Sequence, residues 1–193
     1  MGAAQHSGAV ASSVRRWRPG ALVVCAALLV GCGASTPVSA SVFNAGDVMF
    51  LQMMVPHHRQ GIGIVGLARD RARRPEITVL AAAIEATQAS EMETMAGWLR
   101  SWGQPAVAAE DAHAAHGGMP GTSEADIATL ATRTGVDFER DFLHLMIAHQ
   151  DDAIQMARME TATGQNPAVR DLARRIDLSR SAQIQTMLAW LAG

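Results

Sequence analysis

Apolar residues recur every three or four positions in four long stretches of the chain, with polar residues between them. This is the period of an amphipathic α-helix. The pattern predicts helices over residues 46–73, 75–102, 135–163 and 166–191. Pro75 and Pro167 stand where proline opens a helix with its φ angle already set, and Asn166 is a suitable N-cap. The sequence therefore predicts an all-α fold.

The second pair of predicted helices repeats the first pair at a constant spacing of 92 residues. The matches include Phe50 with Phe142, Met54 with Met146, His57 with His149, Pro75 with Pro167, Met95 with Met187, and Trp98 with Trp190. Each half then forms one helical hairpin, and two such hairpins bury their apolar faces by packing together. We expect a four-helix bundle built from two tandem hairpins.

The first 31 residues have the pattern of an export signal. Three arginines precede a short apolar run over residues 21–30, which is about half of the ~20 residues that a membrane-spanning helix needs. The run ends in the sequence LVGC, which resembles the bacterial lipobox and implies cleavage before Cys32 and lipidation of that residue. Ordinary signal cleavage and an uncleaved anchor are the alternatives.

Removal of this leader would leave a tether and one folded domain. Residues 32–45 are mostly small and lack a helical period, which is typical of a flexible tether, and residues 46–193 form the predicted bundle. We expect the protein to be exported and held on the extracytoplasmic face of the cell membrane by the lipid on Cys32.

Composition narrows the choice of partners and ligands. All 16 basic residues are arginine and are outnumbered by 18 Asp and Glu, so there is no basic stripe for a nucleic acid. The only two cysteines are Cys25, inside the leader, and Cys32. The exported domain therefore has no thiol, and any soft metal ligand must be methionine.

Two histidines occupy equivalent inward positions. At 100° per residue, His57 and His149 fall at the centre of the apolar faces of their helices, whereas His58 falls at the edge. On the second helix Glu91 also points inward, and on the fourth Arg180 does. Because burying such groups unpaired is costly, Glu91 must bind a metal, pair with Arg180 or accept a hydrogen bond from a histidine.

Methionines surround both histidines. They are Met49, Met53 and Met54 near the first, Met146, Met156 and Met159 near the second, and Met92, Met95 and Met187 on the facing helices. Thioether and imidazole donors suit Cu(I), and Ag(I) in the same way. Met95 and Glu91 are candidate ligands on the facing helix. The alternative is that methionine only fills the core and that the histidines are satisfied core residues.

The linker between the halves, residues 103–122, carries a second candidate cluster. His113, His116 and Met119 lie within the stretch AHAAHGGMPG. This cluster is either a metal-capture loop or an ordinary low-complexity linker. A short helix is predicted after it, from Ser123 to Thr134.

The segments DVMFLQMMVPHHRQGI and MIAHQDDAIQMA, with the paired endings MAGWL and MLAWL, resemble the bacterial family called domain of unknown function 305. The resemblance implies an exported, ferritin-like four-helix bundle, and some members of the family are copper-binding proteins that support copper resistance. It also implies copper ligands at Met54, His57, His58, Met146, His149 and Met156. Two departures are Gln150 in place of a second histidine and a linker that keeps only Met119.

From these observations we expect a copper-binding lipoprotein that sequesters or hands over Cu(I), with Ag(I) and Cu(II) as further ions, and that is not an enzyme. A copper-exchanging protein is the expected partner. The competing hypotheses are a scaffold lipoprotein without metal and a redox enzyme on a ferritin-like frame. Neutral histidine is needed for ligation, so affinity should fall below about pH 6.5.

Overall fold

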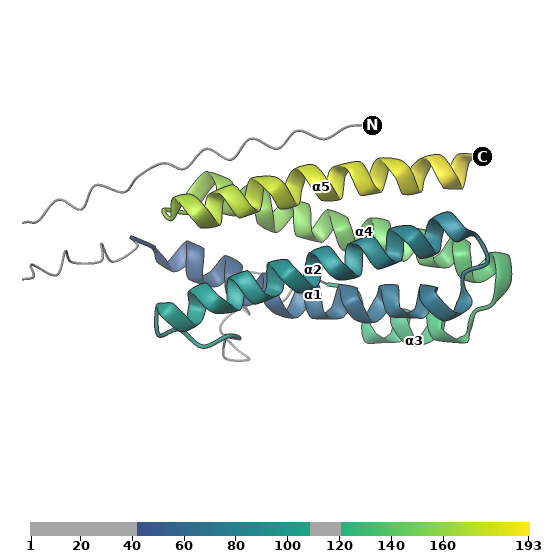
Figure 1. Cartoon of the computed structure of the whole chain (residues 1–193), viewed down its shortest axis with the longest axis horizontal. Coiled ribbons are helices and arrows are strands. Elements are labelled where there is room, and N and C mark those ends of the chain that lie inside the picture. The colour runs from purple at the N-terminus through teal and green to yellow at the C-terminus, as the bar shows by residue number, and fades with distance from the viewer. Residues whose placement is uncertain (1–41, 109–120) are drawn as a thin grey trace, which may run out of the picture. The chain divides into compact units, whose positions relative to one another are not determined.

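The computed structural model describes residues 42–108 and 121–193, and the helices in these ranges are shown in Figure 1. They are α1 (Ala45–Arg71), α2 (Pro75–Ser101), α3 (Glu124–Thr132), α4 (Gly135–Thr163) and α5 (Pro167–Ala192). No strand occurs in the described residues. The all-α prediction is confirmed, and every predicted bound of the four long helices is within two residues of the observed one.

The helix ends are fixed by the residues that the sequence offers there. Asn44 and Asp47 form a reciprocal capping box at the start of α1. The same Asp47 carboxylate accepts the backbone N–H groups of Gln165 and Asn166, at 3.1 and 2.9 Å, in the turn between α4 and α5. One buried carboxylate therefore joins the start of the first hairpin to the turn of the second.

A second carboxylate explains why α1 ends two residues before its predicted bound. Glu139 of α4 accepts hydrogen bonds from the backbone N–H groups of Arg73 and Arg74, at 2.6 and 2.7 Å. These N–H groups therefore bond to α4 and are not available to extend α1. Pro75 then opens α2 at its first position, as expected.

The long helices form two hairpins, α1 with α2 and α4 with α5, which pack on each other through α1 and α4 (Figure 1). The short α3 packs against α4. Because the start of α1 lines a pocket with the end of α4, these two helices run antiparallel. None of the described helices has the length and apolar character needed to cross a membrane.

The buried core consists of two apolar clusters. The first lies at the starts of α1 and α5 and at the ends of α2 and α4, and includes Leu51, Met54, Met95, Met156 and Ile176. The second lies at the opposite ends of the same helices, and includes Ile64, Ile84, Phe142, Met146 and Met187. On each long helix, about two to three turns separate the buried residues of the two clusters.

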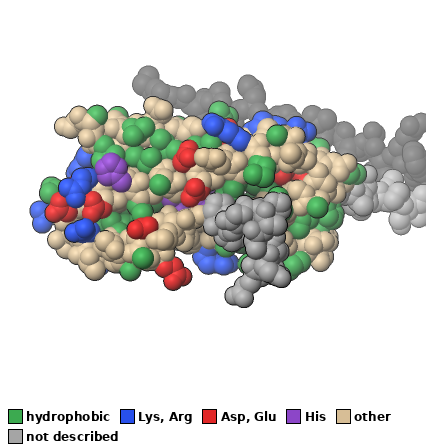
Figure 2. All heavy atoms as spheres, turned by 180° about the vertical axis from the view of Figure 1, so that it is seen from behind, with side chains coloured by type: hydrophobic (Ala, Val, Ile, Leu, Met, Phe, Trp, Pro, Cys, Tyr) green, Lys and Arg blue, Asp and Glu red, His purple; other side chains and the backbone are tan. Residues whose placement is uncertain are grey.

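Charges are mixed on the outer surface. On the face shown in Figure 2, arginine and acidic side chains are interspersed with apolar and neutral ones. This face therefore carries no basic stripe of the kind that nucleic-acid binding needs.

Candidate metal centre

Polar side chains from all four long helices fill the space between the two apolar clusters. We call these eight residues the polar layer: His57 and His58 of α1, Gln88 and Glu91 of α2, His149 and Gln150 of α4, and Arg180 and Gln183 of α5. All are buried except Glu91 and Gln183, which are partly exposed. A polar layer in the middle of an apolar core needs either internal hydrogen bonds or a ligand.

His57 and His149 stack on each other at the centre of this layer. Their ring centroids are 3.9 Å apart and their planes differ by 14°, so the predicted inward placement of both residues holds. Burial lowers the pKa of His149 to about 4, with a further contribution from the positive charge of Arg180. Burial, together with the neighbouring His149, lowers the pKa of His57 well below its usual value. Both rings are therefore neutral near pH 7, which is the form that binds metal.

His58 is held by a buried ionic network. Its Nε2 lies 2.7 Å from the Glu91 carboxylate, which also accepts a hydrogen bond from Arg180. Burial alone would raise the pKa of Glu91, but the hydrogen bond with His58 and the charge of Arg180 outweigh it and lower that pKa. Of the three roles open to Glu91, the structure shows the ion pair and the hydrogen bond to histidine together.

This network fixes the tautomer of His58. An ionised carboxylate only accepts hydrogen bonds, so Nε2 of His58 carries the proton and Nδ1 carries the lone pair. Nδ1 is buried and has no hydrogen-bond partner. The sequence placed His58 at the edge of the apolar face, and that placement is wrong: the residue is fully buried, because Glu91 and Arg180 from two other helices cover it.

The second hairpin has a neutral version of the same arrangement. At the spacing of 92, His58 corresponds to Gln150 and Glu91 to Gln183, and the amide of Gln150 donates to Gln183. Arg180 likewise corresponds to Gln88, whose amide lies 3.5 Å from Gln150 Oε1. Residues 92 positions apart therefore both contribute hydrogen bonds to the polar layer, while its charges are confined to one side.

Several imidazole nitrogens in the layer lack partners. Both ring nitrogens of His57, Nδ1 of His58 and Nε2 of His149 are buried without a hydrogen bond. Thr122 Oγ1 lies 3.3 Å from the other nitrogen of His149. Buried polar atoms without a protein partner are rare and need a water, an ion or a functional role to account for them. Imidazole nitrogens are good donors for copper, so the residues present fit a copper ion.

Gly61 leaves room for Nε2 of His149, one of the unpaired nitrogens. A Cβ atom at position 61 would lie 2.6 Å from His149 Nε2 and 2.4 Å from Gln88 Oε1. Both distances are shorter than non-bonded atoms allow, so only glycine fits here without displacing the two side chains. The absent side chain thus allows α1 to lie close to the imidazole of α4.

The candidate methionine ligands lie on both sides of the polar layer. Met54, Met95 and Met156 belong to the first apolar cluster, and Met146 belongs to the second. The structure therefore does not gather them into one group. In residues 42–108 and 121–193, no three His, Cys, Asp or Glu side chains are arranged to hold a metal ion. A metal ion here would need thioether as well as imidazole donors.

Some predicted residues lie outside the part of the chain that the structure describes, and one residue near the centre was not predicted. His113, His116, Met119 and Cys32 lie outside the described residues. Thr122, at the end of the linker, was not predicted to contact the centre; Gln60 holds it with two hydrogen bonds, of 2.8 and 2.9 Å. No periodic signal in the sequence marks Thr122, because the contact depends on where the linker rejoins the bundle.

Comparisons with solved structures give the same fold. A DUF305 protein from Streptomyces coelicolor that is inferred to be secreted is 31% identical, with a TM-score of 0.72 over 76% of this chain and 92% of that one. A DUF305 fragment from Deinococcus radiodurans is also 31% identical, with a TM-score of 0.66 over 77% of this chain and 97% of the fragment.

The chain is also similar to a protein whose metal-bound forms are known. CopM in its Cu(I)-bound form is 30% identical, with a TM-score of 0.62 over 75% of this chain and 94% of CopM. CopM has also been solved with Cu(II) and with Ag bound. No curated protein sequence matches the chain significantly. The sequence profile of the domain of unknown function (DUF305) matches residues 47–191, and the chain therefore belongs to the DUF305 family.

Proposed function

We propose that this protein binds copper as Cu(I), with Ag(I) and Cu(II) as further ions, and that it sequesters the metal or hands it to another protein. Copper is then cargo and takes part in no catalytic step. The ligands come from the polar layer and from four methionines beside it, which are Met54, Met95, Met146 and Met156. Support comes from the DUF305 fold, the similarity to CopM in its copper-bound and silver-bound forms, and the donor chemistry of the buried residues.

The observation that carries this proposal is the stacked pair of His57 and His149. The two rings are buried and neutral, and three of their four nitrogens have no partner. Lone pairs lie in the ring planes, and stacked rings direct them nearly parallel to each other. A single ion bound by both rings would therefore require one ring to turn.

The surroundings favour a soft ion. Thioethers and imidazoles select Cu(I), whereas carboxylate and water ligands suit harder ions. Glu91 has its carboxylate engaged by His58 and Arg180, so its role in this proposal is to orient His58. Because burial lowers the pKa of all three histidines, copper binding should persist below the pH of 6.5 expected from the sequence.

The proposal includes export and anchoring through Cys32. The lipobox-like sequence supports lipidation there, and a lipid anchor would keep the bundle at the extracytoplasmic membrane surface, where His113, His116 and Met119 of the linker would capture ions. A ferritin-like origin by internal duplication is part of the same proposal. In cells that express the full chain, Cys32→Ala should move the protein from the membrane fraction to the soluble exported fraction. Retention in the membrane would contradict lipid anchoring.

A competition titration tests the metal proposal. His57→Ala combined with His149→Ala should lower Cu(I) stoichiometry against a chromophoric Cu(I) chelator under anaerobic, reducing conditions. His144→Ala is the matched control, since His144 is an exposed histidine on the same helix as His149. Circular dichroism checks that each variant keeps its helices. Unchanged stoichiometry in the double variant would reject a copper site at the stacked pair.

A further inference from the structure

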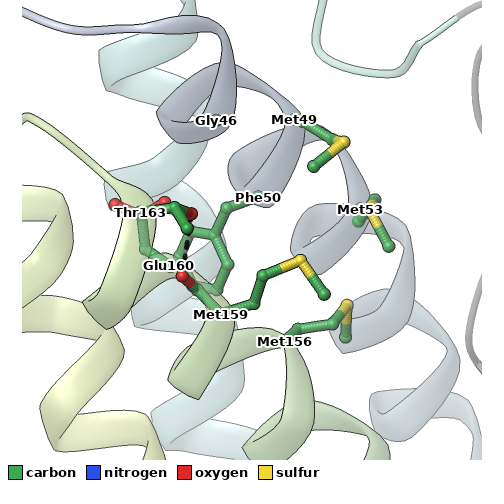
Figure 3. A pocket seen from close by; sticks show the side chains of 8 residues that line it. All are labelled: Gly46, Met49, Phe50, Met53, Met156, Met159, Glu160 and Thr163. Carbon is green, nitrogen blue, oxygen red and sulfur yellow. Dashed lines mark hydrogen bonds between the residues drawn. The ribbon is translucent and has the colours of Figure 1, made fainter. Parts of the chain in front are cut away.

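A second group of sulfur atoms lies away from the histidines, at the end of the bundle where α1 begins and α4 ends. Met49 and Met53 of α1 and Met156 and Met159 of α4 line one pocket, together with Phe50 and Glu160. Figure 3 shows the four thioether side chains reaching from the two helices toward the space between them. None of these four residues belongs to the polar layer.

Helix geometry explains how the four methionines meet. Residues four apart and three apart on a helix share a face, so Met49 lies beside Met53, and Met156 lies beside Met159. Because α1 and α4 are antiparallel, the two pairs face each other across the helix interface. Met53 and Met156 are buried, while Met159 is 53% exposed. The pocket therefore has a buried floor and an outer edge that solvent reaches.

The size and donor chemistry of the pocket suit one soft ion. Its free volume is about 20 Å³, which holds a single water-sized guest. Glu160 and Thr163 are the lining residues with polar side chains. The Thr163 hydroxyl already donates to the Met159 carbonyl at 2.9 Å. Both Glu160 oxygens are buried without a hydrogen-bond partner, and burial raises the pKa of this carboxyl to about 8, so it is neutral near pH 7 and a poor ligand for a soft ion. Four thioethers instead offer the soft donors that Cu(I) and Ag(I) prefer.

We propose that Met49, Met53, Met156 and Met159 form a second binding site, for one monovalent soft metal ion, at the open end of the α1–α4 interface. The inference extends the proposed function to a second ion. It rests on residues other than the histidines, so the two sites can fail separately. The exposed position of Met159 makes this the site that exchanges its ion with solvent or with a partner protein.

The test uses Ag(I), which has no redox chemistry under the conditions of the assay. The pocket variant is Met49→Leu with Met159→Leu, because leucine preserves volume and neither residue is a candidate ligand of the polar layer. The control variant is Met92→Leu with Met187→Leu, which removes two thioethers elsewhere. Silver nitrate in chloride-free buffer is equilibrated by dialysis with each full-length protein, and bound silver is counted by elemental analysis.

We expect the pocket variant to lose one Ag(I) per chain, or to bind that ion at least tenfold more weakly, while the control variant matches the unmodified protein. The variant His57→Ala with His149→Ala should keep this ion. Equal silver content in the pocket variant and the unmodified protein would overturn the inference. Loss of silver only in the histidine variant would do the same while leaving the proposed function in place.

A second measurement guards against misfolded variants. In the unmodified protein labelled with ¹³C-methyl methionine, one equivalent of Ag(I) beyond the histidine site should shift the resonances of Met49, Met53, Met156 and Met159 together. The Met187 resonance should stay in place. If the four pocket resonances stay fixed at saturating silver, these methionines are only core-filling residues.

Discussion

The two hairpins solve the same packing problem with different chemistry. In the first, His58 and Glu91 form a buried pair completed by Arg180 from the other hairpin. In the second, Gln150 and Gln183 occupy the corresponding positions, and Gln88 approaches Gln150 from the other hairpin. One side of the polar layer is therefore ionic and the other is neutral, although the backbone positions correspond.

The ionic and neutral sides of the polar layer differ in what they can do: one can orient a metal ligand, and the other only stabilises the helix packing. The neutral side leaves only the amide oxygen of Gln88 buried without a partner among its three glutamines, and an oxygen ligand suits harder ions than Cu(I). The His58–Glu91–Arg180 network costs desolvation energy, yet it leaves Nδ1 of His58 buried without a hydrogen-bond partner. In our proposal the ionic side therefore adds an oriented His58 to the central pair of His57 and His149, while the glutamines of the neutral side support the helix packing.

The largest expected effect comes from removing the arginine. Arg180→Leu leaves Glu91 partly buried without its cation, and breaking such a pair costs about 3 kcal/mol or more. Gln88→Leu, at the matching position, removes one neutral hydrogen bond and should cost about 1 kcal/mol. Urea unfolding measures both free energies. Equal losses in the two variants would show that the hairpins are energetically alike.

The next effect is on the pH dependence of stability. His149 keeps a pKa of about 4 when folded, against 6.5 for a free histidine, so between these values the unfolded chain binds more protons and stability falls as pH falls. The loss from His149 alone should be about 3 kcal/mol by pH 4. His149→Gln should lower the slope of unfolding free energy against pH by up to one proton, with His57 keeping part of it, whereas Gln150→Leu should leave the slope unchanged. An unchanged slope in His149→Gln would assign the loss to other groups.

Glu91→Gln tests the orienting role with a smaller effect. An amide can donate as well as accept a hydrogen bond, so the proton of His58 is no longer held on Nε2. In the other tautomer Nδ1 carries the proton and cannot bind metal. Cu(I) affinity should fall about tenfold, as is typical when a group that orients a metal ligand is lost. The control is Gln183→Leu on the neutral side, which should keep its affinity in the same chelator competition. Equal affinities for Glu91→Gln and the unmodified protein would contradict this role.

The smallest effect is expected from converting the neutral side. Gln150→His places an imidazole at the position that corresponds to His58, where the Gln183 carbonyl oxygen can accept its N–H. Stability should change by about 1 kcal/mol or less, and Cu(I) affinity should rise by less than about tenfold. Chelator competition measures the affinity. Weaker binding than in the unmodified protein would mean that this side cannot accommodate a ligand.

Local rules predicted the helices and the inward histidines. The helical period, the prolines that open α2 and α5, and the 100° rotation placed His57 and His149 correctly because each rule concerns one helix at a time. The burial of His58 could not be predicted in that way, because the residues that cover it come from α2 and α5. The partner of Glu91 was likewise left open among three choices until the helices were placed together.

The pocket lined by Met49, Met53, Met156 and Met159 also depends on contacts between helices, which the sequence does not predict. The spacing of Met49 from Met53 and of Met156 from Met159 is visible in the sequence. Whether the two pairs face each other depends on the direction in which α1 packs against α4. The stacking of the two histidine rings also depends on that packing. Positions on single helices were therefore predictable, and contacts between helices were not.

Gly61 limits how this protein can be made more stable. Glycine inside a helix is about 1 kcal/mol less favourable than alanine, so alanine at this position would strengthen α1 if the helix stood alone. In the folded chain the added methyl group would push against His149 and Gln88, so a substitution that favours the helix would disturb the packing of the polar layer. Gly63 is free of that conflict, since no atom lies within 4 Å of a Cβ added there. An engineer seeking a more stable bundle with an intact centre would begin at position 63.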